Sequence, residues 1–323
     1  MMNYCKISAI STYLPDAVLR NSDLEKQFPD FKAAKITKKI GIQQRHIAAA
    51  GETALDMGEK AAKKLFSICP EAQEADFLLF CTQSPDYFLP TSACILQARL
   101  GLKSTTGALD YNLGCSGFVY GLAVAKGLLA AEIASKVLLI TAETYSKYLD
   151  AADKGNRSIF GDGAAAVLIS SCEEAHIGEF VLGTDGNGGQ NLILRNGGAR
   201  NPLDGSANDK LYMNGPEIFN FTIETVPRLV SDILAKNSMT LDQVDHFVFH
   251  QANKYMLSYL GLKIGIPEDK FHIDMEDTGN TVSASIPILL EKLQSREILH
   301  PGDRLLLAGF GVGYSFGGAV VTW

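Results

Sequence analysis

The stretch DYNLGCSGFVYG, residues 110–121, organises the rest of the chain. A strand-like segment leads to Gly114, Cys115 follows, and an apolar helix rich in small residues continues to about residue 131. A cysteine placed where a strand becomes a helix meets free backbone N–H groups and the positive end of the helix dipole, which lower the thiol pKa. We therefore expect Cys115 to be a nucleophile. The simpler alternative is a buried cysteine that acts as a small apolar residue.

The composition is typical of a folded globular protein. The 323 residues suffice for two ordinary domains or one large domain, with 46% hydrophobic and 20% charged residues. A net charge of −7 argues against nucleic acid as a general partner. The sequence has no run of 18 apolar residues and no signal-peptide pattern at its start, so we expect a cytoplasmic protein that does not associate with membranes.

The cysteines follow neither a metal-site nor a disulfide pattern. They include no C-x-x-C pair, and no histidine stands at metal-ligand spacing from them. We therefore expect no metal site, no disulfide framework and a reducing compartment. The six cysteines are Cys5, Cys69, Cys81, Cys94, Cys115 and Cys172.

Two halves of the sequence repeat one order of motifs. The buried-strand run DFLLFC at 76–81 resembles DHFVFH at 245–250, and Gly-Cys at 114–115 and Gly-Asn at 279–280 each precede an apolar helix. The strand 136–142 corresponds to 304–308, and the glycine turn and strand from 160 correspond to those from 316. We predict an internally duplicated α/β fold with mostly parallel sheets covered by helices. The expected halves are residues 1–172 and 173–323, with a glycine-rich insertion at about 183–215 in the second.

The repeat predicts a shared crevice. Ligands of such sheets bind beyond the carboxyl ends of the strands, so the ends of 76–81 and 245–250 and the helix starts at 115 and 280 should converge. This geometry would gather Cys115, His250 and Asn280, which provide a nucleophile, a group that moves or stabilises charge, and a neutral hydrogen-bond donor. The glycine-rich segment 309–318 does not fit a nucleotide loop because strand-like residues follow it. A tight loop with backbone N–H groups near Cys115 better fits an oxyanion site.

With these motifs in this order, the sequence resembles β-ketoacyl-acyl-carrier-protein synthase III, a family of the thiolase-like superfamily. The motifs are NLGCSGF around Cys115, HQAN from His250 and GNTVSAS with Asn280. The resemblance also includes GIQQRHIA at 41–48, FGDGA at 160–164 and the C-terminal glycine loop, and so covers nearly the whole chain.

The resemblance implies a two-step Claisen condensation. An acyl-coenzyme A would acylate Cys115 while the backbone N–H groups of Cys115 and Val312 hold the thioester oxygen. Malonyl on acyl-carrier protein would then lose carbon dioxide, and His250 and Asn280 would hydrogen-bond the enolate oxygen. The enolate would attack the acyl-Cys115 thioester. Coenzyme A and phosphopantetheine thioesters are then substrates, and no metal or redox cofactor is required.

The resemblance also implies binding residues. Asn253 would contact the pantetheine arm, Phe219 would line its tunnel, and Leu89 would reach the acyl pocket of the other subunit of a homodimer. Many members stack the adenine between a tryptophan and an arginine, but the matching positions here are Lys35, or a neighbour of it, and Lys154. The first acyl donor could therefore be an unusual coenzyme A thioester or an acyl group on carrier protein.

Two further residue types bear on the substrates. Pro216 stands where many members have a pantetheine-binding asparagine. Carrier proteins are acidic, so an acidic enzyme needs a local basic rim at its tunnel mouth. Lys254 and Lys263 are the candidates, together with Lys38 and Lys39; the alternative is ordinary surface charge.

Three other functions stay open at this point. The first is a pathway-specific acyltransferase on the same fold with a nucleophile other than malonyl. The second is a non-catalytic partner subunit, which the presence of Cys115, His250 and Asn280 disfavours. The third is a cysteine hydrolase, although the papain-like signature is absent.

Overall fold

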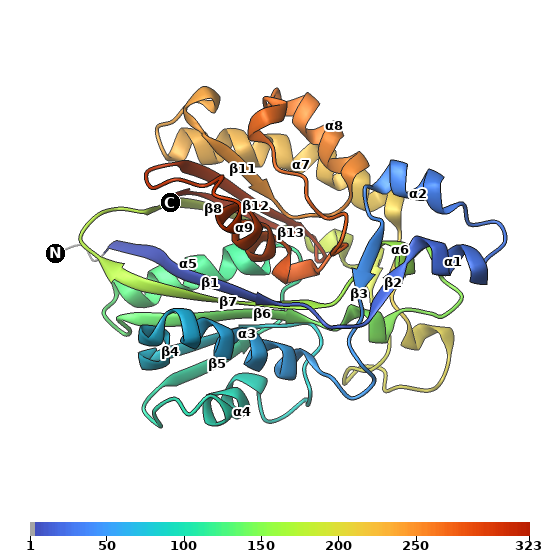
Figure 1. The fold of residues 1–323 in the computed structure, drawn as a ribbon, viewed down its shortest axis with the longest axis horizontal. Helices are drawn as coiled ribbons and strands as arrows, with labels where there is room; N and C mark the ends of the chain where they lie inside the picture. The colour runs from blue at the N-terminus through green and yellow to red at the C-terminus, as the bar shows by residue number, and fades with distance from the viewer. Residues whose placement is uncertain (1–3) are drawn as a thin grey trace.

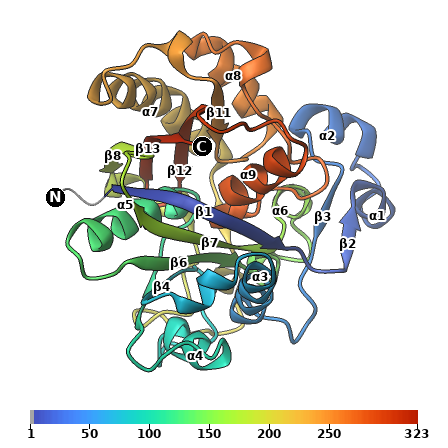
Figure 2. The same ribbon diagram turned by 60° about the vertical axis from the view of Figure 1, so that its left-hand side comes forward.

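The computed structural model describes residues 4–323 and consists of five layers (Figure 1). Two sheets alternate with three helical layers, and the turned view separates the layers from α4 at the bottom to α7 and α8 at the top (Figure 2). The first sheet has the order β1-β7-β6-β4-β5 and the second β11-β12-β13-β8. The strands of the first sheet are β1 (Tyr4–Tyr13), β4 (Phe77–Cys81), β5 (Gly107–Tyr111), β6 (Lys136–Glu143) and β7 (Gly163–Cys172). Those of the second are β8 (Ile177–Thr184), β11 (His246–Phe249), β12 (Arg304–Gly311) and β13 (Ser315–Thr322).

Helices cover both faces of each sheet. α3 (Ala54–Ile68) and α4 (Ser92–Arg99) pack on the outer face of the first sheet, and α7 (Gly215–Lys236) and α8 (Lys254–Ile264) cover the outer face of the second. α5 (Gly117–Ala130) and α9 (Ser285–Ser295) lie between the two sheets. α5 is apolar on nearly all sides, as expected of a helix enclosed by two sheets.

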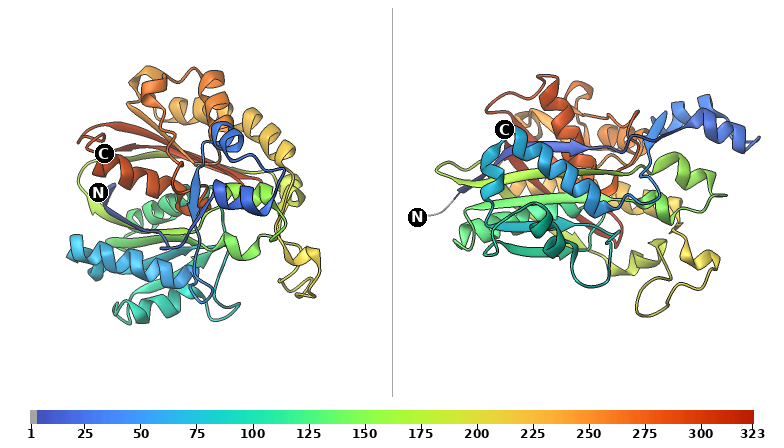
Figure 3. Two further views of the ribbon diagram at one scale, coloured as in Figure 1. Left: turned by 45° about the vertical axis from the view of Figure 1, so that its right-hand side comes forward. Right: turned by 60° about the horizontal axis from the view of Figure 1, so that its bottom comes forward.

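Shorter elements gather at one end of the layers. Figure 3 shows α1, α2 and the segment between β8 and α7 projecting from this end, away from both termini. The predicted glycine-rich insertion forms that segment and contains a two-stranded pair. The short elements are β2 (Val18–Arg20), α1 (Asn21–Gln27), α2 (Ala33–Ile40), β3 (Gln44–His46), α6 (Lys154–Ile159), β9 (Leu192–Ile193) and β10 (Tyr212–Met213). The 3-10 turns used below are η2 (Tyr145–Tyr148) and η7 (Val282–Ala284).

The predicted duplicated α/β fold is confirmed. β4, β6 and β7 occupy the same order and directions in the first sheet as β11, β12 and β13 in the second. β5 pairs in parallel with β4, and the matching place beside β11 holds one parallel bridge, between Phe247 and Phe271. The strands of the first sheet come from residues 4–172 and those of the second from 177–322. That residues 1–172 and 173–323 are separate domains stays a prediction.

The sheets are mixed, which corrects the expectation of mostly parallel pairing. β4 pairs in parallel with β5 and β6, and β11 with β12. The pairs β1–β7, β6–β7, β12–β13 and β8–β13 are antiparallel. Residues 312–314 joining β12 to β13 are too few for a crossover. The segment between β6 and β7 stays at the end of the sheet where β6 finishes, so β7 must run back.

No helix among residues 4–323 is long and apolar enough to cross a membrane.

Candidate active site

Cys115 lies in the connection between β5 and α5. It is 6% exposed and packs against residues from both halves of the chain. Two glycines of β12 let this strand pass beside it: a Cβ added at Gly309 would stand 2.8 Å from the Cys115 carbonyl oxygen, and one added at Gly311 would stand 2.8 Å from its Sγ. The buried neighbours of Cys115 are Tyr145, Leu149, Phe160 and Val282.

Burial raises the pKa of the Cys115 thiol to about 12, although backbone N–H groups of Val312 and of Cys115 itself bond to the sulfur and oppose the rise. Burial therefore outweighs the lowering that the sequence analysis expected from the helix start. The helix does begin two residues later, at Gly117, but β12 and Val282 enclose the sulfur and remove the water that would solvate a thiolate.

His250 follows β11 directly, and its backbone N–H donates to the Ala308 carbonyl at 2.8 Å. Its ring is buried, with Nδ1 2.7 Å from Ser285 Oγ. Ser285 Oγ also lies 3.0 Å from the Val282 carbonyl oxygen and donates to it. This pattern assigns the proton of the neutral ring to Nδ1 and leaves Nε2 as an acceptor. Burial lowers the pKa of His250 to about 3, so the ring is neutral near pH 7.

Asn280 precedes η7 and faces His250. Its Oδ1 accepts from the Val282 N–H at 2.9 Å, which directs Nδ2 toward His250 Nε2 at 3.5 Å. Its backbone bridges to the first half, because Asn280 N donates to the Ile159 carbonyl and its own carbonyl accepts from Gly161 N. Val282 has φ +54°, an unusual conformation for a β-branched residue. The turn thus holds Val282 against Cys115 and Asn280 against His250.

The structure therefore brings together the three residues that the sequence analysis singled out. Val282 contacts Cys115 and hydrogen-bonds Asn280, whose carboxamide faces His250. Ser285, which fixes His250, was missed because a serine at a helix start is ordinary in sequence. A signal for Ser285 was available in the sequence. A buried imidazole needs a hydrogen-bond partner for each nitrogen. The repeat also places the start of the helix that follows Asn280 beside the end of the strand that precedes His250, so a polar residue at that helix start could have been expected to contact the ring.

A cavity of about 1190 Å³ opens beside Val312. Gln83 lies at its inner wall, where the hydroxyl of Tyr145 donates to Gln83 Oε1 and Gln83 Nε2 donates to Asn112 Oδ1 at 3.0 Å. Leu89, 83% exposed, lies in a loop of its outer wall. The rest of that wall comes from the segment 192–211.

Two predicted binding residues have structural partners of their own. Asn253 caps the start of α8, since its Oδ1 accepts from Met256 N at 2.9 Å. Phe219 stacks on Tyr255 with ring centroids 5.7 Å apart and meets Tyr259 edge-on. Their contacts with pantetheine stay predictions.

The predicted lysines lie on α2, α6 and α8. Lys154 begins α6 and forms an ion pair with Asp30, while Lys35 is exposed on α2. Lys254 lies against Gly41, and Lys263 Nζ donates to the Ile223 carbonyl at 2.7 Å. The other two basic candidates, Lys38 and Lys39, are exposed on α2. Their contacts with coenzyme A or carrier protein also stay predictions.

A cofactor site was not among the expectations. In residues 4–323, no group of three or more histidine, cysteine, aspartate or glutamate side chains is arranged to hold a metal ion.

The layered, duplicated fold and this buried group define the class of thiolase-like enzymes. The family described as 3-Oxoacyl-[acyl-carrier-protein (ACP)] synthase III matches residues 109–186, and its C-terminal counterpart matches residues 234–323. The chain belongs to this family of β-ketoacyl-acyl-carrier-protein synthase III condensing enzymes, as the sequence resemblance predicted.

Individual relatives are similar to this chain over nearly their full length. The chain is 38% identical to "Beta-ketoacyl-[acyl-carrier-protein] synthase III" of Streptococcus uberis, covering 99% of each chain. It is similar to a 3-oxoacyl-(acyl-carrier-protein) synthase III of known structure, with a TM-score of 0.97 and 46% identity over 99% of this chain and 100% of that one. The Thermus thermophilus enzyme of the same type gives a TM-score of 0.92 at 33% identity, over 98% and 99% of the two chains.

Proposed function

We propose that this condensing enzyme is an acyltransferase that uses Cys115 as its nucleophile. The thiol attacks the carbonyl of an acyl thioester, the bond to the departing pantetheine sulfur breaks, and the Cys115 proton leaves with that thiol. The backbone N–H groups of Cys115 and Val312 hold the developing oxyanion, which makes up for the absence of solvent around the sulfur. The cavity beside Val312 supports an acyl chain entering from this side.

Malonyl carried on acyl-carrier protein is the proposed second substrate. Its carbon–carboxylate bond breaks to release carbon dioxide, and the electron pair forms an enolate whose oxygen accepts hydrogen bonds from Asn280 Nδ2 and His250. Rotation of the Ser285 hydroxyl toward Nδ1 supports the tautomer with a proton on Nε2. The enolate carbon then bonds to the acyl carbon, and the Cys115 sulfur leaves. The neutral, buried His250 facing Asn280 carries this proposal.

An intact-mass measurement tests the proposal. The protein is incubated with a panel of acyl-coenzyme A and acyl-carrier-protein donors, which also identifies the donor class. We expect an acyl adduct that is absent in Cys115→Ala, and we expect His250→Ala and Asn280→Ala to be acylated but to condense poorly. No adduct from any donor, or equal loss of both half-reactions, would contradict the assigned roles.

A pathway-specific acyltransferase with a nucleophile other than malonyl is the second candidate, and Lys35 and Lys154 in place of the adenine-stacking pair bear on the acyl donor and not on this choice. Lys154 is already paired with Asp30, so less of its charge is free for phosphate. Release of carbon dioxide that depends on malonyl-carrier protein separates the two candidates, because only the condensation produces it. Activity on its own would exclude a non-catalytic partner subunit.

We further propose a homodimer in the cytoplasm. Phe88 and Leu89, 84% and 83% exposed, lie on the outer cavity wall, and a second copy of the chain would cover them. The six free cysteines are consistent with a reducing compartment. Light scattering at several concentrations tests the dimer, and Leu89→Asp is expected to shift the mass toward a monomer.

A further inference from the structure

Glu143 is a buried carboxyl group that the proposed reaction does not use. It is the last residue of β6 and is fully buried. Its Oε2 accepts from Gln83 N at 3.0 Å and from Ser84 Oγ at 3.2 Å, and its Oε1 accepts from Ser283 Oγ at 2.8 Å. These three hydrogen-bond donors are all neutral. A buried acid held by neutral donors alone is unusual and costly when charged.

The three donors belong to the two halves of the active site. Gln83 and Ser84 follow β4, and the Gln83 side chain lies against the Cys115 connection: a Cβ added at Gly114 would stand 2.5 Å from Gln83 Oε1. Ser283 lies in η7, between Asn280 and the Ser285 that holds His250. One carboxyl group from the first half therefore joins the loop beside the nucleophile to the turn that carries the hydrogen-bond donors.

The charge of Glu143 also acts on the nucleophile. Burial raises the pKa of Glu143 to about 8, while the hydrogen bonds from Gln83, Ser283 and Ser84 oppose the rise. When Glu143 is ionised, its charge in turn raises the pKa of the Cys115 thiol. The titratable groups of the neighbouring elements that interact with Glu143 are Cys81 of β4, Tyr111 of β5, Tyr145 and Tyr148 of η2, Cys115, and Asp162 before β7.

We propose that Glu143 is a positioning residue that holds the Asn280 turn in register with the Cys115 connection and places a titratable charge near the thiol. The inference rests on the proposed role of Cys115 as the nucleophile. At low pH the neutral carboxyl group leaves thiol ionisation unopposed. Above about pH 8 the carboxylate opposes it, so the reactivity of Cys115 rises less steeply with pH than that of an isolated thiol.

The test measures alkylation of Cys115 by iodoacetamide between pH 6.5 and 9.5, followed by peptide mass spectrometry. The wild-type rate should rise about tenfold per pH unit, as the thiolate fraction does, and then less steeply above about pH 8. Glu143→Gln keeps hydrogen-bonding groups but has no charge. The alkylation rate of Cys115 in this variant should therefore rise as steeply above pH 8 as below it. The ratio of the variant rate to the wild-type rate should be near one at pH 6.5 and should exceed one at pH 9.5, where the wild-type carboxylate opposes ionisation of the thiol.

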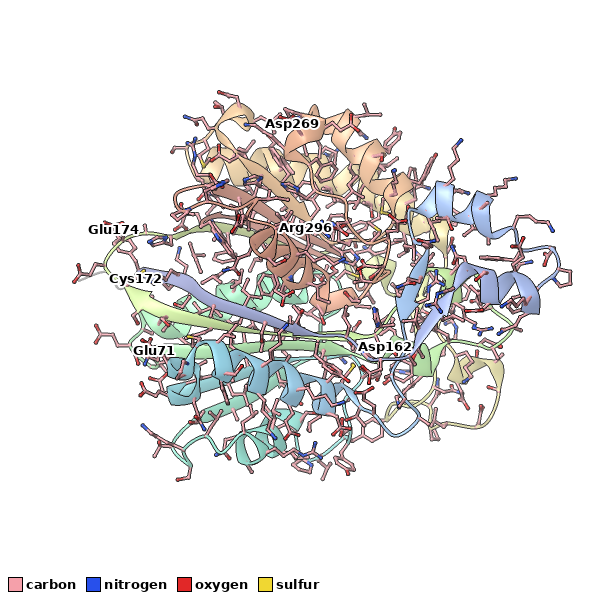
Figure 4. All side chains as sticks on the ribbon, viewed as in Figure 1. Glu71, Asp162, Cys172, Glu174, Asp269 and Arg296 are labelled. Atoms are coloured by element: carbon pink, nitrogen blue, oxygen red, sulfur yellow. The ribbon has the colours of Figure 1, made fainter. Side chains whose placement is uncertain are left out.

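Ser283→Ala provides a second test that keeps the carboxyl group. The break in the profile is the pH at which the alkylation rate begins to rise less steeply. Ser283→Ala removes a hydrogen-bond donor to the ionised Glu143 carboxylate, so the break should move above pH 8 and condensation should slow more than acylation. As a matched control, Asp162→Asn removes another buried carboxyl group at the same end of the first sheet (Figure 4), bonded to Ala48 N and Ser146 N. It should retain the break, shifted to lower pH, because the Asp162 charge raises the pKa of Glu143.

Three outcomes would overturn the inference. They are a wild-type profile without a break, a variant-to-wild-type ratio that is constant with pH, and loss of the break in Asp162→Asn. If Glu143→Gln does not fold, the wild-type and Ser283→Ala profiles still decide. Alkylation requires no acyl or malonyl substrate, so its result is separate from failure of the proposed condensation.

Discussion

Replacing Ser285 by alanine tests how the His250 ring is held. The hydroxyl lies 2.7 Å from Nδ1 and 3.0 Å from the Val282 carbonyl, in a fully buried setting. In the condensation His250 carries its proton on Nε2, and the rotated Ser285 hydroxyl donates to Nδ1. Without that hydroxyl the buried Nδ1 has no donor in this tautomer, at a cost of about 1–3 kcal/mol. If this cost falls on the step that needs His250, condensation slows by about 5- to 150-fold, at 1.36 kcal/mol per tenfold.

The two half-reactions are measured separately. Acylation of Ser285→Ala, followed by intact mass, should stay within about threefold of the wild type, since the oxyanion groups are unchanged, whereas carbon dioxide release from malonyl-carrier protein should fall as calculated. Ser295→Ala is the matched control, because Ser295 Oγ makes a similar bond to a helix carbonyl at the exposed end of α9. Equal loss of both half-reactions, or unchanged condensation in a folded variant, would refute the reasoning.

Three further predictions concern packing, pH and the turn before Asn280. Gly309→Ala places a Cβ 2.8 Å from the Cys115 carbonyl oxygen, so chemical denaturation should show a loss of about 1–3 kcal/mol and acylation should slow; unchanged values would contradict the close approach. His250 has a folded pKa of about 3 against 6.5 when unfolded, so its stabilising contribution is present above pH 6.5 and is lost as the pH falls toward 3. Between pH 6.5 and 5 this loss is about 2 kcal/mol, and denaturation at pH 7.5 and 5 should find His250→Ala less acid-sensitive than the wild type by that amount; equal sensitivity would be inconsistent with a buried neutral ring. Lys292→Met removes the ion pairs from α9 to Asp274 and Asp277, so thermal unfolding should show about 1–2 kcal/mol less stability; a melting temperature equal to that of the wild type would argue against this anchor.

The duplicated fold was predictable because its signals are local. DFLLFC and DHFVFH are short apolar runs with polar residues before them, and both repeats place glycine before an apolar helix. Once the repeat was recognised, the ends of strands and starts of helices brought Cys115, His250 and Asn280 together. That step needed only the order of the elements, because the carboxyl ends of neighbouring parallel strands lie at the same end of the sheet.

The rest depends on long-range contacts. An apolar run carries no direction, so β7 and β13 could not be assigned as antiparallel from their composition. The Cys115 pKa depends on β12 and Val282, which follow it by more than 160 residues and exclude solvent. Glu143 is an ordinary acidic residue until the fold places Ser283 against it. The sequence alone therefore did not show the direction of β7 and β13, the exclusion of solvent from the Cys115 thiol or the side-chain partners of Glu143.

The pseudo-symmetry of the two sheets has an evolutionary consequence. The position after β11 carries His250, whereas its counterpart at the end of β4 is Cys81, a buried thiol bonded to the Leu113 carbonyl at 3.1 Å. The helix start that bears Cys115 in one copy bears Asn280 in the other. The strand-end position has thus acquired a chemical role in one copy only, whereas the helix-start position has acquired a different role in each copy. Mutations around the nucleophile can diversify the accepted acyl group while the donor set, encoded in a separate stretch of the gene, stays under its own selection.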